Sequence, residues 1–177
     1  YARTFEVELL DQFVEALVSG SLPDAIEQSD KDSRYWPLIN TRAHGLIDWT
    51  WSASEIAAFI NAFDDPYEGA ATWYRGERVH LKACSLIVES NEFHPFQAGL
   101  ILRQSAGEIV VAARGGSIVI NDVLSVEGAR ITQTLRVGNR LYTLASALDG
   151  ARSARVSYTS LGPRVQQGVP AERGFQE

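Results

Sequence analysis

The chain has 177 residues, of which 45% are hydrophobic and 21% charged, and its formal net charge is −6. This composition is typical of a soluble globular protein, and the length fits one sizeable core or a small domain with a helical attachment. No apolar run approaches the roughly 18 residues of a membrane-spanning helix, and no secretory signal begins the chain. The single cysteine, Cys84, fits a reducing compartment, so we expect a cytoplasmic protein that meets no membrane.

Acidic residues concentrate in the first third of the chain. Residues 1–65 carry four Lys and Arg against twelve Asp and Glu, residues 66–135 carry six against seven, and residues 136–177 carry six against three. A nucleic-acid-binding protein usually presents a basic face to the phosphates. We therefore do not expect nucleic acid as a partner, although net charge leaves room for a local patch in the arginine-bearing tail.

Residues 4–23 predict a first, amphipathic helix. Its apolar side chains recur at helical spacing, Thr4 is a candidate N-cap, and Gly20 is a candidate stop. The residues that follow are polar and acidic and offer nothing to cover the apolar stripe. Either later elements fold back over it, or its partner lies upstream of Tyr1. The chain contains no methionine, and we expect it to be a piece of a longer protein.

A second helix is predicted after Trp51. Ser52 and Glu55 have the spacing of a capping box, in which each side chain binds a backbone N–H of the first turn. Trp51 and Ile56 have the spacing of a hydrophobic staple. Pro66 ends the helix, because the residue before a proline is pushed out of helical geometry.

From Ala70 onward the hydrophobic period changes to two, which predicts strands. A hairpin is expected around Gly76, and further short strands are separated by turn sequences such as Gly115-Gly116. A short helix at 145–153 and a last strand at 154–160 follow. We predict an α+β fold, with short N-terminal helices followed by a small OB-like open β-barrel of about five to six strands.

Residues typical of catalysis are scarce. The three histidines, His44, His80 and His94, are too far apart in sequence for a zinc site, and we expect ordinary surface or half-buried side chains. Cys84 lies within a predicted strand whose apolar and polar residues alternate, and we expect it to be a small core residue. The sequence contains no nucleophile elbow and no phosphate-binding glycine loop. We expect this chain to have no catalytic machinery of its own.

The segment GLIDWTWSASEIAAFINAFDDPYEGA resembles the linker and first C-terminal elements of the folate-dependent formyltransferases. That family includes enzymes acting on methionyl-tRNA and on amino-sugar nucleotides. Many spaced positions agree with its pattern: Tyr35, Pro37, Gly45, Ile47, Asp48, Trp49, Ser52, Ala53, Ile56, Ile60, Ala62, Pro66, Tyr67, Gly69 and Ala70.

Departures from the family pattern matter as much. Asn61 replaces a usual arginine, Glu68 replaces a second proline, and Leu38 and Ile39 stand where basic residues are common. The catalytic Asn-x-His motif of the family is not in this sequence. The resemblance therefore implies a C-terminal portion only. We expect four parts: residues 1–33 from the end of a catalytic domain, a linker at 34–51, a helix and barrel at 52–160, and a polar tail at 161–177.

The resemblance implies transfer of a formyl group from N10-formyltetrahydrofolate to an amine, with the donor bound by the chain's own upstream catalytic domain. Because the middle of the chain is nearly neutral, we favour a small-molecule amine, an amino-sugar nucleotide, as the acceptor. One alternative is the tRNA-contacting domain of a methionyl-tRNA formyltransferase. Another is a stand-alone binding module without catalysis. A homodimer is left open.

Four residues around the joint are candidate substrate-binding residues: Asp48, Trp49, Asn61 and Tyr67. A joint between domains is a common place for a ligand cleft, and an aromatic ring can stack on a base or a sugar. The alternative is structural, with Trp49 and Tyr67 packing the joint and Asp48 capping a loop.

Overall fold

The computed structural model describes residues 2–21, 24, 26, 27, 29, 31, 33, 34, 37–87, 93–105, 107–160 and 162–166. Tyr35 of the family pattern and residues 167–177 of the expected tail lie outside the described residues. The chain divides into two compact units, residues 1–36 and 37–177, and each is described by itself.

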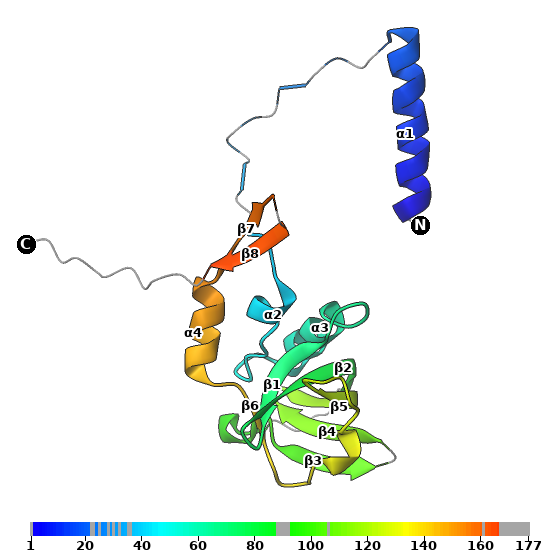
Figure 1. The fold of residues 1–177 in the computed structure, drawn as a ribbon. Coiled ribbons are helices and arrows are strands. Elements are labelled where there is room, and N and C mark those ends of the chain that lie inside the picture. The colour runs from blue at the N-terminus through cyan, green and yellow to red at the C-terminus, as the bar shows by residue number, and fades with distance from the viewer. Residues whose placement is uncertain are drawn as a thin grey trace, which may run out of the picture. The chain divides into compact units, whose positions relative to one another are not determined.

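The first unit contains helix α1 (Ala2–Ser19), drawn in dark blue in Figure 1. It begins before Thr4, so Thr4 lies within the helix and is not the predicted N-cap. Gly20 has a φ of 67° and donates its N–H to the carbonyl of Leu17 at 3.3 Å, which confirms the predicted stop. Most large apolar side chains of α1, including Phe5 and Leu9, are more than half exposed, so its own unit does not bury them.

The second unit begins with two helices. Helix α2 (Thr41–His44) is short, and Asn40 caps it by accepting from the N–H of Ala43. Helix α3 (Ala53–Ala62) has the predicted capping box: the N–H of Glu55 donates to Ser52 Oγ at 3.3 Å, and the N–H of Ser52 donates to Glu55 Oε2 at 2.8 Å. The inward face of α3, including Ile60, is fully buried against the sheet.

Trp51 holds the entrance of α3. The sequence pairs it with Ile56, and in the structure Trp51 packs against the core cluster that contains Ile56 and also contacts Phe59, edge to face at 5.0 Å between ring centroids. Trp51→Ala is expected to lower the free energy of unfolding by about 1 kcal/mol or slightly more, because it removes this packing and frees the helix entry. Chemical denaturation measures the change. Phe96→Ala is the control, because Phe96 is 81% exposed and its loss is expected to change little; equal effects would contradict the prediction.

The predicted OB-like barrel is confirmed as a curled six-stranded antiparallel sheet with the order β3-β4-β5-β2-β1-β6 (Figure 1). The expected hairpin at Gly76 joins β1 and β2, and the turn between β4 and β5 is formed by Arg114 and Gly115, with Gly116 as the first residue of β5. The strands are β1 (Ala70–Tyr74), β2 (Glu77–Ile87), β3 (Ile101–Ser105), β4 (Glu108–Ala113), β5 (Gly116–Ser125) and β6 (Leu141–Tyr142).

Backbone hydrogen bonds join the two edges of this sheet. The N–H of Leu141 donates to Gly99 O at 2.8 Å, and the N–H of Ile101 donates to Asn139 O at 2.9 Å. The two segments come so close that a Cβ at position 99 would lie 2.0 Å from the carbonyl oxygen of Leu141, and Gly99 has a φ of 79°. Only glycine fits this position, and it lets the sheet close toward a barrel.

The alternation of β2 breaks at Ala83. This residue has a φ of 52°, in the left-handed region. Cys84 instead of Ala83 therefore joins the core, and Leu86 is 41% exposed. The prediction of Cys84 as a core residue is confirmed, and burial raises the pKa of its thiol to about 12.

Two 3-10 helices connect the barrel strands: η2 (Pro95–Gln97) precedes β3, and η3 (Thr132–Thr134) follows β5. After β6 the chain forms helix α4 (Ala145–Ser153) and then the strand β7 (Arg155–Thr159), close to the expected ranges. A paired strand, β8 (Gly162–Gln166), follows where a polar tail was expected. Gly162, which has a φ of 109°, begins β8 opposite Thr159.

Candidate functional site

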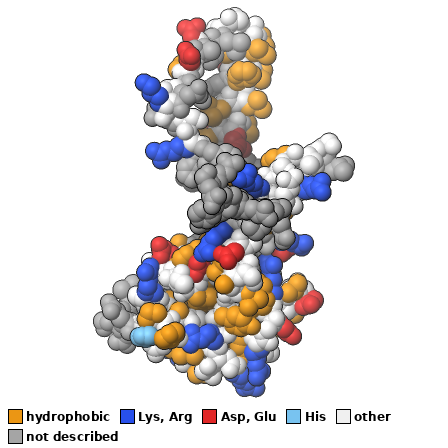
Figure 2. All heavy atoms as spheres, turned by 90° about the vertical axis from the view of Figure 1, so that its left-hand side faces the viewer, with side chains coloured by type: hydrophobic (Ala, Val, Ile, Leu, Met, Phe, Trp, Pro, Cys, Tyr) orange, Lys and Arg blue, Asp and Glu red, His pale blue; other side chains and the backbone are white. Residues whose placement is uncertain are grey.

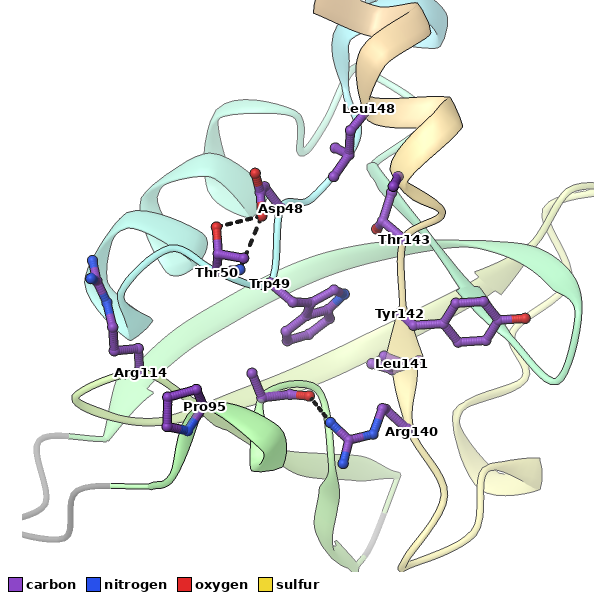
Figure 3. A pocket seen from close by; sticks show the side chains of 12 residues that line it. Asp48, Trp49, Thr50, Pro95, Arg114, Arg140, Leu141, Tyr142, Thr143 and Leu148 are labelled. Carbon is purple, nitrogen blue, oxygen red and sulfur yellow. Dashed lines mark hydrogen bonds between the residues drawn. The ribbon is translucent and has the colours of Figure 1, made fainter.

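A cavity of about 580 Å³ opens beside the barrel in the second unit. Four segments distant in sequence form it: residues 48–50 before α3, the η2 segment, Arg114 in the turn between β4 and β5, and the chain from Arg140 in front of β6 to Leu148 in α4 (Figure 3). Its walls are mostly apolar, and its charged groups are one aspartate and two arginines. Cavities of this size and character are the usual sites for small ligands.

Trp49 forms part of the wall and is fixed in place. It is 8% exposed, and its indole Nε1 donates a hydrogen bond to Thr72 Oγ1 at 2.9 Å. Thr72 Oγ1 in turn donates to the carbonyl of Tyr142 at 2.9 Å. Because this chain of hydrogen bonds satisfies the indole N–H, Trp49 offers the cavity an apolar ring in one orientation.

Asp48 is nearly buried, and its charge is compensated. Its Oδ1 accepts hydrogen bonds from the N–H of Thr50 at 3.0 Å and from Thr50 Oγ1 at 2.7 Å. Its Oδ2 accepts from Arg152 Nη2 at 3.0 Å, and the Asp48 side chain is 8% exposed. Asp48 thus shapes the loop before α3 and ties it to α4.

Arg140 carries the cavity's uncompensated positive charge. Its Nη1 donates to the carbonyl of Ala98 at 2.6 Å, and its Nη2 donates to the carbonyl of Phe96. Within the described part of the chain, no carboxylate forms an ion pair with it. The second arginine, Arg114, lies 3.8 Å from Glu55, and both side chains are more than half exposed. Such an exposed pair compensates its charges only weakly.

The other two predicted binding residues do not line this cavity. Asn61, at the end of α3, makes two hydrogen bonds to the backbone of Cys84: its Nδ2 donates to the carbonyl at 2.9 Å, and its Oδ1 accepts from the N–H at 3.1 Å. Tyr67 lies in the turn after α3 and is 52% exposed. The structure therefore brings Asp48 and Trp49 together and places Asn61 and Tyr67 elsewhere, with Asn61 holding α3 to β2.

Asp64 adds a pH-dependent contact to the junction of α3 and β2. Burial raises the pKa of its carboxyl, but hydrogen bonds from the N–H groups of Ala83 and Asp65 and the charge of Lys82 outweigh this and lower the pKa overall. A folded-state pKa below the unfolded value of about 3.9 gives stability that is present above that pH and lost as the pH falls.

Asp64→Asn is therefore expected to reduce the loss of stability between pH 6 and pH 3. Urea unfolding at several pH values measures this dependence. Asp149→Asn is the control, because Asp149 has a 73% exposed side chain and pairs only with Arg152 on the surface. If the two variants keep the same pH dependence as the unsubstituted chain, the role of Asp64 is refuted.

The histidines serve the fold. His44 Nε2 lies 3.2 Å from Ala154 O, His80 Nδ1 lies 3.3 Å from Gly69 O, and His94 Nδ1 accepts from the N–H of Phe96 at 3.2 Å. His80 is buried, and burial lowers the pKa of its ring. Across the residues that the structure describes, no three His, Cys, Asp or Glu side chains come together as a metal site.

Figure 2 shows that hydrophobic side chains gather on one face of the barrel unit, with Lys and Arg side chains among and around them. The arginines of the cavity were not among the predicted site residues, because no local motif marks them. The excess of arginine after residue 135 was a signal for Arg140 but not for Arg114. Of the described helices, none combines the length and apolar character needed to cross a membrane.

The fold and the cavity define a small OB-like domain with a ligand-sized hollow at its edge. The sequence of residues 40–136 matches the family described as formyl transferase, C-terminal domain. The chain belongs to this family, which confirms the resemblance found in the sequence.

Relatives from several bacteria are similar to this chain. The methionyl-tRNA formyltransferase of Dechloromonas aromatica (strain RCB) is 30% identical over 118 residues, covering 67% of this chain and 36% of the relative. That of Acetivibrio thermocellus is 28% identical over 115 residues, covering 65% and 36%. That of Methylacidiphilum infernorum (isolate V4) is 30% identical over 161 residues, covering 90% and 45%. The chain thus spans less than half the length of these relatives.

Proposed function

We propose that this chain is the C-terminal, non-catalytic part of a formyltransferase that acts on methionyl-tRNA, and that its barrel helps to hold the RNA. The observation that carries this proposal is the similarity to methionyl-tRNA formyltransferases, which for one relative extends over 90% of the chain. It replaces the amino-sugar nucleotide acceptor favoured by the sequence, because these relatives give that acceptor no support.

The local arrangement of charge supports an RNA partner where the net charge did not. Residues 136–177 carry an excess of arginine, and Arg140 reaches the cavity rim without a described carboxylate partner. A guanidinium held by backbone carbonyls keeps its charge available for a phosphate. The acidic residues before position 66 lower the total charge of the chain without removing this local site.

Among the described residues that line it, the cavity lacks a free acid or base of the kind that formyl transfer needs. Asp48, the carboxylate that lines the cavity, is neutralised by Arg152, and no histidine is among the cavity residues. Proton transfer during formylation needs a group with a free acid or base function. We therefore assign N10-formyltetrahydrofolate and the catalytic residues to an upstream domain. In this proposal, residues 1–33 contain the last helix of that upstream domain. Residues 34–51 are the linker, and residues 52–160 are the domain that holds the RNA.

Binding to methionine-charged initiator tRNA tests the proposal. The fluorescence anisotropy of labelled tRNA is measured with the 177-residue chain over a range of salt concentrations. We expect the logarithm of the binding constant to fall linearly with the logarithm of the salt concentration, because phosphate contacts release counterions. We also expect no formyl transfer by this chain alone. Absence of tRNA binding at low salt, or turnover of an amino-sugar nucleotide, would refute the proposal.

A further inference from the structure

We propose that the cavity between Trp49, η2 and α4 is a binding site for a nucleoside 5′-phosphate. The base lies against the apolar wall, and the phosphate lies on the guanidinium of Arg140. The nucleotide has two sources, a free mononucleotide or an unpaired nucleotide of a bound RNA. Only the second source rests on the proposed function.

The walls of the cavity suit a flat apolar ring. They include Trp49, Leu141 and Leu148, and the volume of about 580 Å³ lies within the range of known small-ligand sites. Trp49 cannot turn away without breaking its bond to Thr72. A fixed aromatic ring is the common platform for an unstacked base, and such stacking needs no hydrogen bonds to the base edge. This matters here because Asp48 and the indole N–H are already paired.

The rim of the cavity suits a phosphate. The carbonyls of Phe96 and Ala98 hold Arg140 in one orientation, and these contacts use two of its five N–H donors. The other three N–H donors remain available for an anion that enters the cavity. Arg114, on another segment of the rim, adds a second and only weakly compensated positive charge. Figure 3 shows the two guanidinium groups on different sides of Pro95.

The carboxylate in the wall does not oppose an anion. Asp48 is held by Arg152 at 3.0 Å, so the aspartate and its partner contribute almost no net charge. The same ion pair positions α4, whose Ala145 and Leu148 complete the wall. Because β6 and α4 follow residue 136, half of this wall lies beyond the segment that matches the family.

Calorimetric titration of the 177-residue chain with adenosine 5′-monophosphate tests the site. We expect saturable binding that is tighter than that of adenosine or of inorganic phosphate alone. Arg140→Gln is expected to weaken binding by about tenfold or more, and Arg140→Lys by less, because lysine keeps the charge but not the paired donors. Ala145→Phe fills the hollow without changing charge and is also expected to weaken binding. Arg103→Gln is the control: it removes a charge from an exposed strand residue outside the cavity.

Two RNA hairpins distinguish the sources of the nucleotide, one with a blunt stem and one with unpaired 3′ nucleotides. Tighter binding of the second hairpin, lost in Ala145→Phe, identifies an RNA-borne nucleotide. Equal binding of both hairpins together with monophosphate binding identifies a free nucleotide. The site is refuted if monophosphate does not bind, or if Arg140→Gln and Arg103→Gln weaken it equally. Neither result decides the salt-dependent tRNA test, which examines the proposed function separately.

Discussion

Trp49→Ala is expected to lower the free energy of unfolding by about 3–5 kcal/mol, the range for removing a buried aromatic side chain from a core. Trp49 belongs to the core of the barrel unit, together with Ile47 and Ile56, and is 8% exposed. The substitution leaves a void beside the existing cavity, and it also removes the hydrogen bond from Trp49 Nε1 to Thr72. Equilibrium unfolding in urea, followed by far-ultraviolet circular dichroism, measures the loss.

Two further variants separate packing from hydrogen bonding at this position. Trp49→Phe keeps an aromatic ring and removes the indole N–H, so it is expected to cost about 1–2 kcal/mol. Trp73→Ala is the matched control, because Trp73 is only half-buried and lies outside the core cluster. If Trp49→Ala costs no more than Trp73→Ala, Trp49 does not anchor the loop before α3, and the rigid platform inferred for the cavity is lost with it.

Features fixed by neighbouring residues were predictable from the sequence. The capping box of Ser52 and Glu55 formed as expected because both partners lie within one helical turn. The hairpin at Gly76 and the turn at Gly115-Gly116 formed where glycine permits positive φ. The strand alternation also predicted the inward face of β2, until the left-handed residue Ala83 interrupted it.

Features that join distant segments were not predictable in this way. The ion pair between Asp48 and Arg152 spans 104 positions, and nothing near either residue indicates the other. The cavity is formed by four segments that are distant in sequence, so its arginines carry no local signature. Asn61 was predicted as a binding residue because it lies near the joint in the sequence, but in the structure its amide pairs with the backbone of Cys84 in β2.

Net charge was a weak guide to the acceptor. The net charge sums the acidic first third of the chain and the arginines that follow residue 135. A bound ligand interacts mainly with charges within about 10 Å, the screening distance at moderate salt. Arg140 reaches the cavity rim because the closure of the sheet brings β6 beside η2. The sequence alone does not indicate this closure. The charges around the cavity thus depend on topology more than on composition.

Asn61→Leu is expected to lower the free energy of unfolding by about 2 kcal/mol. The amide of Asn61 pairs with both backbone groups of Cys84, as a neighbouring strand would, and a leucine of similar size leaves both groups without that partner. Each hydrogen bond contributes about 1 kcal/mol net, and an unsatisfied buried group adds a penalty of similar size. The partial exposure of Asn61 keeps the estimate at the lower end of this range.

The same variant separates a structural from a binding role for Asn61. Because Asn61 does not line the cavity, Asn61→Leu is expected to leave the affinity for adenosine 5′-monophosphate unchanged at temperatures where the variant remains folded. Asn121→Leu is the matched control, because Asn121 makes one side-chain hydrogen bond, to the carbonyl of Ala83, and is expected to cost about half as much. A stable Asn61→Leu protein with weakened nucleotide binding would restore Asn61 as a binding residue and remove it from the α3–β2 junction.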